Sequence, residues 1–123
     1  MAIGKTLSAN KKMDDESPRR MAPQKAPPLS VNGIRYEVVL RAHLRGFKQS
    51  AGVIAAIEEK TGQEKWIVQV YQTYFDNDEE KDVQNVYITK IELDKKGQGL
   101  IISNERGEKY TINFEGGNIV KID

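Results

Sequence analysis

The stretch that decides the fold class is GIRYEVVLR, residues 33–41. Its apolar side chains recur at every second position and polar ones stand between them: Ile34, Tyr36, Val38 and Leu40 alternate with Arg35, Glu37 and Arg41. A period of two is typical of a strand with one buried and one solvent-facing side. The stretch YTINF, residues 110–114, alternates in the same way. Both stretches predict β-strands.

Between and after these stretches lie further segments rich in β-branched and aromatic residues, which favour strands. They are residues 53–57, 65–75, 83–93, 100–103 and 119–122, separated by turns that contain Gly. We therefore expect an all-β fold, an antiparallel meander of about six or seven strands closed into a small barrel or sandwich. A short helix over residues 50–60, capped by Ser50, is the alternative for that segment alone.

Residues 65–75 form the most apolar of these segments, with apolar side chains on both faces. Such a strand lies in the middle of a sheet, or it curls so that each end buries a different side. Trp66, Tyr71, Tyr74 and Tyr87 make up the richest aromatic group, and a domain of this size needs most of that area in its core.

The first 30 residues differ from the rest in composition. They hold all four prolines and no aromatic residue, and their six basic and three acidic residues give a net charge of +3. Residues 31–123 hold every aromatic residue and carry a net charge of −2. A segment with so few apolar groups cannot offset the entropy of ordering its backbone. We predict a disordered basic tail over 1–30 and a single β-domain over 31–123.

Several function classes are disfavoured by composition. The chain has no Cys, which excludes thiolate metal sites and cysteine nucleophiles, and His43 is its only histidine. A serine hydrolase would have to combine His43 with Ser50 or Ser103. The sequence contains no apolar run long enough for a secretory signal or a membrane span. We expect a cytoplasmic protein that is not an enzyme, holds no metal or cofactor and does not bind a membrane.

Residues 56–66, AIEEKTGQEKW, have the spacing small residue, strand end, acidic residue, Thr-Gly, three variable residues, Trp. This pattern resembles the tryptophan-docking motif of pyrroloquinoline-quinone-type β-propeller proteins. The resemblance implies a hairpin in which Gly62 adopts positive φ and Trp66 packs on a neighbouring layer. A propeller needs about four blades of four strands, and the quinone site has no counterpart here, so no quinone is expected. Residues 100–110 repeat the theme, with Gly107 in the turn and Tyr110 opening the next strand.

Two charged segments are candidate binding sites. The acidic segment, residues 76–82, contains Asp76, Asp78, Glu79, Glu80 and Asp82 and suits either a basic partner protein or a cation. A plain solvated loop that shields strand edges explains it too. The basic loop, residues 41–49, offers Arg41, Arg45, Phe47 and Lys48 to a phosphate backbone and its bases.

Two functions therefore compete. The first is a non-catalytic domain that binds another protein through an aromatic patch of Tyr71, Tyr74 and Phe75 beside the acidic segment. The alternative is a barrel that binds single-stranded nucleic acid through the basic loop and the basic tail. A third hypothesis is an enzyme, or a barrel that binds a small ligand, with a site built from dispersed polar residues. The lack of Cys and the single His disfavour this hypothesis.

Overall fold

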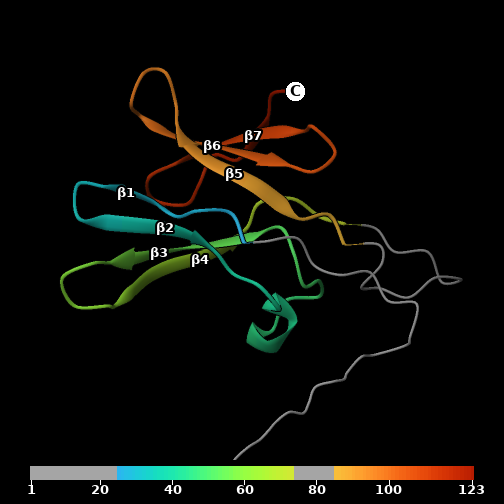
Figure 1. Cartoon of the computed structure of the whole chain (residues 1–123), viewed down its shortest axis with the longest axis horizontal. Helices are drawn as coiled ribbons and strands as arrows, with labels where there is room; N and C mark the ends of the chain where they lie inside the picture. Colours follow the sequence, from blue (N-terminus) through green and yellow to red (C-terminus); the bar gives the residue numbers. More distant parts are fainter. Residues whose placement is uncertain (1–24, 74–84) are drawn as a thin grey trace, which may run out of the picture.

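The structure, a computed structural model, describes residues 25–73 and 85–123. It is all-β, with two four-stranded antiparallel sheets (Figure 1). The first sheet has the order β1 (Leu29–Val31), β2 (Ile34–Val38), β3 (Val53–Glu58) and β4 (Glu64–Gln69). The second has the order β5 (Ile88–Leu93), β6 (Gly99–Asn104), β7 (Lys109–Asn113) and β8 (Val120–Lys121). Both sheets are meanders, because every strand pairs with its neighbour in sequence.

The structure confirms the all-β class and corrects two details of it. The described residues form eight strands, one more than the upper expectation, because the segment before residue 31 adds β1. No strand pairing within residues 25–73 and 85–123 joins one sheet to the other, so of the expected barrel or sandwich the closed barrel is not found. Residues 50–60 contain β3, which overturns the helical alternative for that segment.

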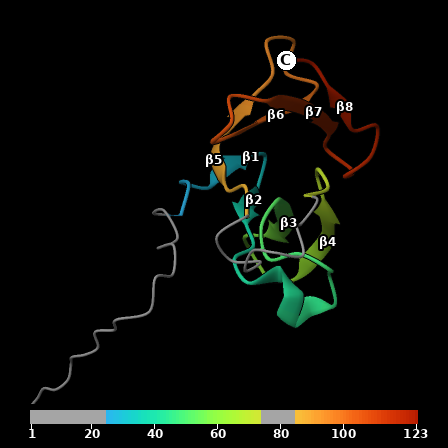
Figure 2. The same ribbon diagram turned by 90° about the vertical axis from the view of Figure 1, so that its right-hand side faces the viewer.

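The two sheets share one core. On the inner face of the first sheet, Tyr36 lies opposite Ala56 and Ala56 opposite Trp66, and the next row is Val38, Ile54 and Val68. The second sheet contributes Ile88, Ile91, Leu100, Ile102 and Ile112 to the same cluster. β1 and β2 contact β5, so the sheets come together along that side (Figure 2).

Strand β4 corrects the expectation of a central strand over residues 65–75. It ends at Gln69 and lies at the edge of its sheet, next to β3 alone. The strand that is apolar on both faces and lies inside the sheet is β3, in which every residue from Val53 to Ile57 is buried. Beyond β4 the chain turns inward, and Val70 and Tyr71 enter the core. The described part of the segment, residues 65–73, therefore fits the second expectation, that the chain curls and each end buries a different side.

Residues 25–30, which the sequence assigned to the tail, contribute to the fold. Ala26 is buried, 4% exposed, and Leu29 and Ser30 pair with Tyr36 and Arg35. The turn to β2 is Asn32-Gly33, and both residues have positive φ, 52° and 82°. That backbone fits the two-residue type I′ turn that Asn-Gly favours in β-hairpins.

The segment between β2 and β3 is held to the rest of the fold by one buried amide. Its single helical turn is the 3-10 helix η2 (Ala42–Arg45). The Gln49 side chain donates to the carbonyls of Ala51 and Tyr71, at 2.7 and 2.8 Å, and accepts from the Thr73 amide at 2.9 Å. Gln49 is buried, so these groups have little access to water.

We predict that Gln49→Ala lowers the free energy of unfolding by about 3 kcal/mol, since it strips three buried backbone groups of their partner. Urea denaturation measures the change, and Gln98→Ala, at an exposed turn position, is the matched control. Equal urea midpoints for the two variants would show that the amide does not hold this segment.

Candidate functional site

The hairpin β3–β4 presents Trp66 to the second sheet. Its turn is closed by the Gly62 amide donating to the Glu58 carbonyl at 2.7 Å and by the Thr61 hydroxyl donating to the Glu58 carboxylate at 2.6 Å. Gly62 has a φ of 77°, which confirms the positive φ expected there. Trp66 follows two residues into β4 and points to the inner face, opposite Ala56.

The Trp66 side chain joins the two sheets. Its indole N–H donates to the carbonyl of Phe114, 3.0 Å away and just beyond the end of β7. Its ring lies 5.9 Å from the Tyr36 ring, centroid to centroid, at an interplanar angle of 40°. The backbone of Gly116 approaches it so closely that a Cβ there would lie 2.8 Å from the indole. One side chain thus contacts β2 and the turn between β7 and β8.

That turn is shaped by Asn113. Its side-chain oxygen accepts from the amides of Glu115 and Gly117, at 3.0 and 2.8 Å, while the Gly116 amide donates to the Asn113 carbonyl at 3.0 Å. This local bonding, typical of Asn in turns, places Phe114, Glu115 and Gly116 over the first sheet. The Phe114 ring lies 6.0 Å from the Tyr36 ring at an angle of 32°.

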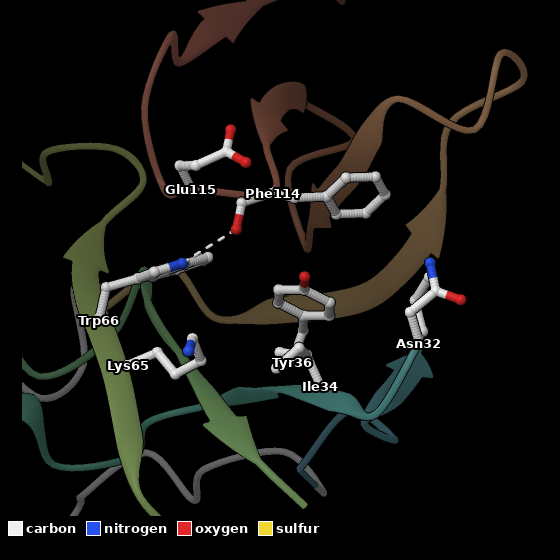
Figure 3. A pocket seen from close by; sticks show the side chains of 8 residues that line it. Asn32, Ile34, Tyr36, Lys65, Trp66, Phe114 and Glu115 are labelled. Atoms are coloured by element: carbon white, nitrogen blue, oxygen red, sulfur yellow. Dashed lines mark hydrogen bonds between the residues drawn. The ribbon is translucent and has the colours of Figure 1, made fainter.

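Around these three aromatic rings lies a cavity of about 370 Å³, which we call the aromatic groove. Figure 3 shows the Tyr36, Trp66 and Phe114 rings around it, with the Glu115 and Lys65 side chains on opposite sides of the indole. Four of its side chains are half-buried, namely Val31, Ile34, Trp66 and Phe114. The described residues that line it are Val31, Asn32, Ile34, Tyr36, Lys65, Trp66, Phe114 and Glu115.

The groove has an apolar floor and charged flanks. Burial, and after it the nearby Glu115 carboxylate, raises the pKa of Tyr36 above its ordinary value of 10, so the phenol is neutral at physiological pH. Its hydroxyl has no hydrogen-bond partner among the described residues. Likewise, Lys65 and Glu115 make no ion pair with any residue of 25–73 or 85–123. Lys65 and Glu115 are exposed, whereas Tyr36 is buried, so the two charged side chains are the more solvent-accessible of these three groups.

The predicted partner-binding residues are placed differently. Tyr71, expected in a contact patch, is 8% exposed, its ring stacks on Tyr110 at 5.2 Å and 20°, and its hydroxyl donates to the Val86 carbonyl. That packing makes it a core residue, as Tyr87 is. The other proposed contacts lie outside the described residues: Tyr74, Phe75, Asp76, Asp78, Glu79, Glu80 and Asp82.

The second hairpin places its aromatic residue as expected. Gly107 has a φ of 79° in the turn between β6 and β7, and the Asn104 side-chain oxygen accepts from the Arg106 and Glu108 amides at 3.0 and 3.1 Å. Tyr110, the second residue of β7, stacks on Tyr71, which belongs to the chain following β4. Gly62, Gly107, Trp66 and Tyr110 thus all have structural roles.

The basic loop presents fewer free cations than the sequence suggests. Arg45 forms an ion pair with Glu64 at 2.6 Å, and Phe47 is half-buried, which fits an anchor of the loop better than a base-stacking platform. Arg41 and Lys48 are exposed, and Arg41 has a left-handed backbone with a φ of 56°. Within residues 25–73 and 85–123, Arg41 and Lys48 form no ion pair, and two exposed cations make a small electrostatic footprint for nucleic acid.

The one histidine does have a serine neighbour. The Ser50 hydroxyl lies 2.7 Å from Nδ1 of His43, whereas Ser103 is in β6. No acidic side chain in the described part of the chain hydrogen-bonds the His43 ring to orient it. Within the same ranges, no cluster of three or more acidic or histidine side chains is arranged to hold a metal ion. The cation site considered for residues 76–82 lies outside them.

Sequence reasoning missed most of the groove. Val31 and Asn32 fell at the predicted tail boundary, although Asn-Gly between Val31 and Ile34 is a strong hairpin signal. Phe114, Glu115 and Gly116 carry no local signal for a groove, because their neighbour Trp66 is 48 residues away from Phe114 in sequence.

Comparison of the sequence with models of known protein families finds no match, and comparison with curated proteins finds none either. In residues 25–73 and 85–123, no helix has the length and apolar character needed to cross a membrane.

We predict that Gly116→Ala destabilises the protein by about 2 kcal/mol, because the new Cβ would meet the Trp66 ring and the residue has a φ of 83°. Gly117→Ala is the control: a Cβ there has no neighbour closer than 3.7 Å, and it should change stability by less than about 0.5 kcal/mol. Urea denaturation followed by the emission of Trp66, the chain's only tryptophan, measures both. Equal effects would mean that the turn does not pack tightly on the indole.

We also predict that stability falls above about pH 10. Burial raises the pKa of Tyr71 well above its ordinary value of 10, so the unfolded chain loses this proton first and binds fewer protons than the native state. The contribution of the Tyr71 phenol to the free energy of unfolding is fully present below about pH 10 and declines as the pH rises further. Urea midpoints between about pH 8 and about pH 11 should fall less steeply for Tyr71→Phe than for the parent. Parallel slopes would refute the assignment to Tyr71.

Proposed function

We propose that this chain is a non-catalytic protein-binding domain whose contact surface is the aromatic groove. The observation that carries the proposal is the groove itself. Half-buried Trp66 and Phe114 lie beside Tyr36, whose hydroxyl has no hydrogen-bond partner within residues 25–73 and 85–123, and one cation and one anion flank them. Aromatic residues at the centre with polar groups at the rim are the usual composition of protein interfaces.

The groove suits a segment of another protein better than a small substrate. Its volume, about 370 Å³, is near the lower end of the range for ligand pockets. Its polar groups do not converge on one point, since Lys65 and Glu115 lie on opposite sides of the indole (Figure 3). Reaction chemistry needs a nucleophile or base held by partners, and the groove lining contains no such pair.

The aromatic contact surface proposed here differs from the one predicted from the sequence. It consists of Tyr36, Trp66 and Phe114 and does not include Tyr71, which is buried. Residues 76–82 remain a proposed contact for a basic part of the partner. Residues 56–66, which resemble the tryptophan-docking motif, serve in this proposal to dock Trp66 within the chain, and they bind no quinone. Nucleic-acid binding remains the second candidate, supported by the exposed Arg41 and Lys48.

The test uses peptides selected from a random library on the immobilised full chain. We predict that they change the emission of Trp66 and bind Phe114→Leu at least about tenfold more weakly, since an aromatic anchor is lost while the apolar volume is largely kept. Leu93→Ala, at an exposed apolar residue of β5, is the control and should bind as the parent does.

Peptides that leave Trp66 emission unchanged, or that bind Phe114→Leu as well as the parent, would show that the groove is not the contact surface. A single-stranded oligonucleotide that changes Trp66 emission and is weakened by Arg41→Glu would favour the second candidate instead. Thermal unfolding of Phe114→Leu confirms that the variant is folded at the assay temperature.

A further inference from the structure

We infer that the aromatic groove takes an extended, proline-centred peptide with a basic residue at one end and an acidic residue at the other. This inference rests on the proposed function and names the chemistry of its ligand. It follows from which hydrogen-bonding groups the groove offers, from the shape of its apolar surface and from the placement of its two charges.

The side chains of the groove offer very few donors and acceptors to a peptide backbone. The indole N–H of Trp66, which would otherwise face a ligand, is already bonded to the Phe114 carbonyl at 3.0 Å. Among the lining side chains, the uncharged polar groups are the Tyr36 hydroxyl and the Asn32 amide. A peptide with an ordinary backbone would bury several N–H groups here without partners, which costs free energy.

Proline removes that difficulty because it has no backbone N–H. A run of prolines is also extended before it binds, so it loses little conformational entropy on docking. Its rings are flat apolar surfaces that fit against aromatic faces, and the groove presents those of Tyr36, Trp66 and Phe114 at mutual angles of 40° and 32°. The Tyr36 hydroxyl can donate to a carbonyl of such a segment.

The charges of the groove specify the ends of the ligand. Lys65 and Glu115 are exposed, oppositely charged and without an ion pair in the described residues. A ligand residue of opposite sign beside each of them is favoured, and a residue of like sign is disfavoured. A lone organic cation is a poorer candidate, although aromatic rings attract cations, because the Lys65 ammonium lines the same groove.

The decisive experiment exchanges the two charges. The probes are the blocked peptides RAPPAPE and EAPPAPR, and the readout is the emission of Trp66 in the full chain. The parent should bind one of the two at least about fivefold more tightly than the other. The double variant Lys65→Glu/Glu115→Lys should prefer the other peptide by a similar factor. Its matched control is Lys95→Glu/Asp123→Lys, which exchanges exposed charges elsewhere and should keep the preference of the parent.

A further peptide and two single variants test the inference without relying on the double variant. The blocked peptide RAAAAAE should bind at least about tenfold more weakly than the preferred proline peptide. The single variants Lys65→Gln and Glu115→Gln should each reduce the preference between the two charged peptides.

The inference is wrong if the parent shows no preference for charge order, if RAAAAAE binds as tightly as the proline peptides, or if tetramethylammonium alone saturates the emission change. Library peptides that lack proline but depend on Phe114 would overturn the ligand chemistry and leave the proposed function standing. Library peptides that ignore Phe114 would overturn both.

Discussion

The rest of the structure depends on the position of one indole. Each sheet is a local meander, and no strand pairing in the described residues links the two. The sheets are therefore held together by side chains, and Trp66 supplies both an apolar contact and a directed bond, from its N–H to the Phe114 carbonyl. The bond fixes the turn between β7 and β8 relative to β4, because a partly buried N–H without this partner would cost free energy.

The same indole makes the groove a preformed site. Tyr36 is 3% exposed and is held from below by the core, while Asn113 shapes the turn that carries Phe114 and Glu115. Side chains that are already fixed lose little entropy when a ligand arrives. The cost is that Gly116 tolerates no side chain, since its backbone lies directly against the indole ring. The proposed binding surface and the contact between the sheets thus share residues.

Much of the fold was predictable because it is local. Alternation located the strands, and the Thr-Gly turn located a docked Trp66 and a positive φ at Gly62. The place of β4 at a sheet edge was not predictable, because both faces of an edge strand are apolar here for different reasons: Trp66 and Val68 face the shared core, whereas Ile67 pairs with Ala55 on the other face. Tyr71 was wrongly expected in an exposed contact patch. It stacks on Tyr110, 39 positions later in the chain, and the spacing of residues in the sequence does not indicate that contact.

The position of the groove follows from a difference between the β3–β4 and β6–β7 hairpins. Each hairpin sends the aromatic residue after its turn toward the opposite half of the fold: Trp66 reaches Phe114, and Tyr110 reaches Tyr71. The rings of Tyr71 and Tyr110 are stacked at an angle of 20° and Tyr71 is buried, so this contact is tightly packed. Around Trp66 the rings are tilted and a cavity remains, flanked by Lys65 and Glu115. Chemically similar contacts thus differ in packing, and the incompletely packed one combines apolar surface with two charges that form no ion pair in the described residues, which is why we propose it as the contact surface.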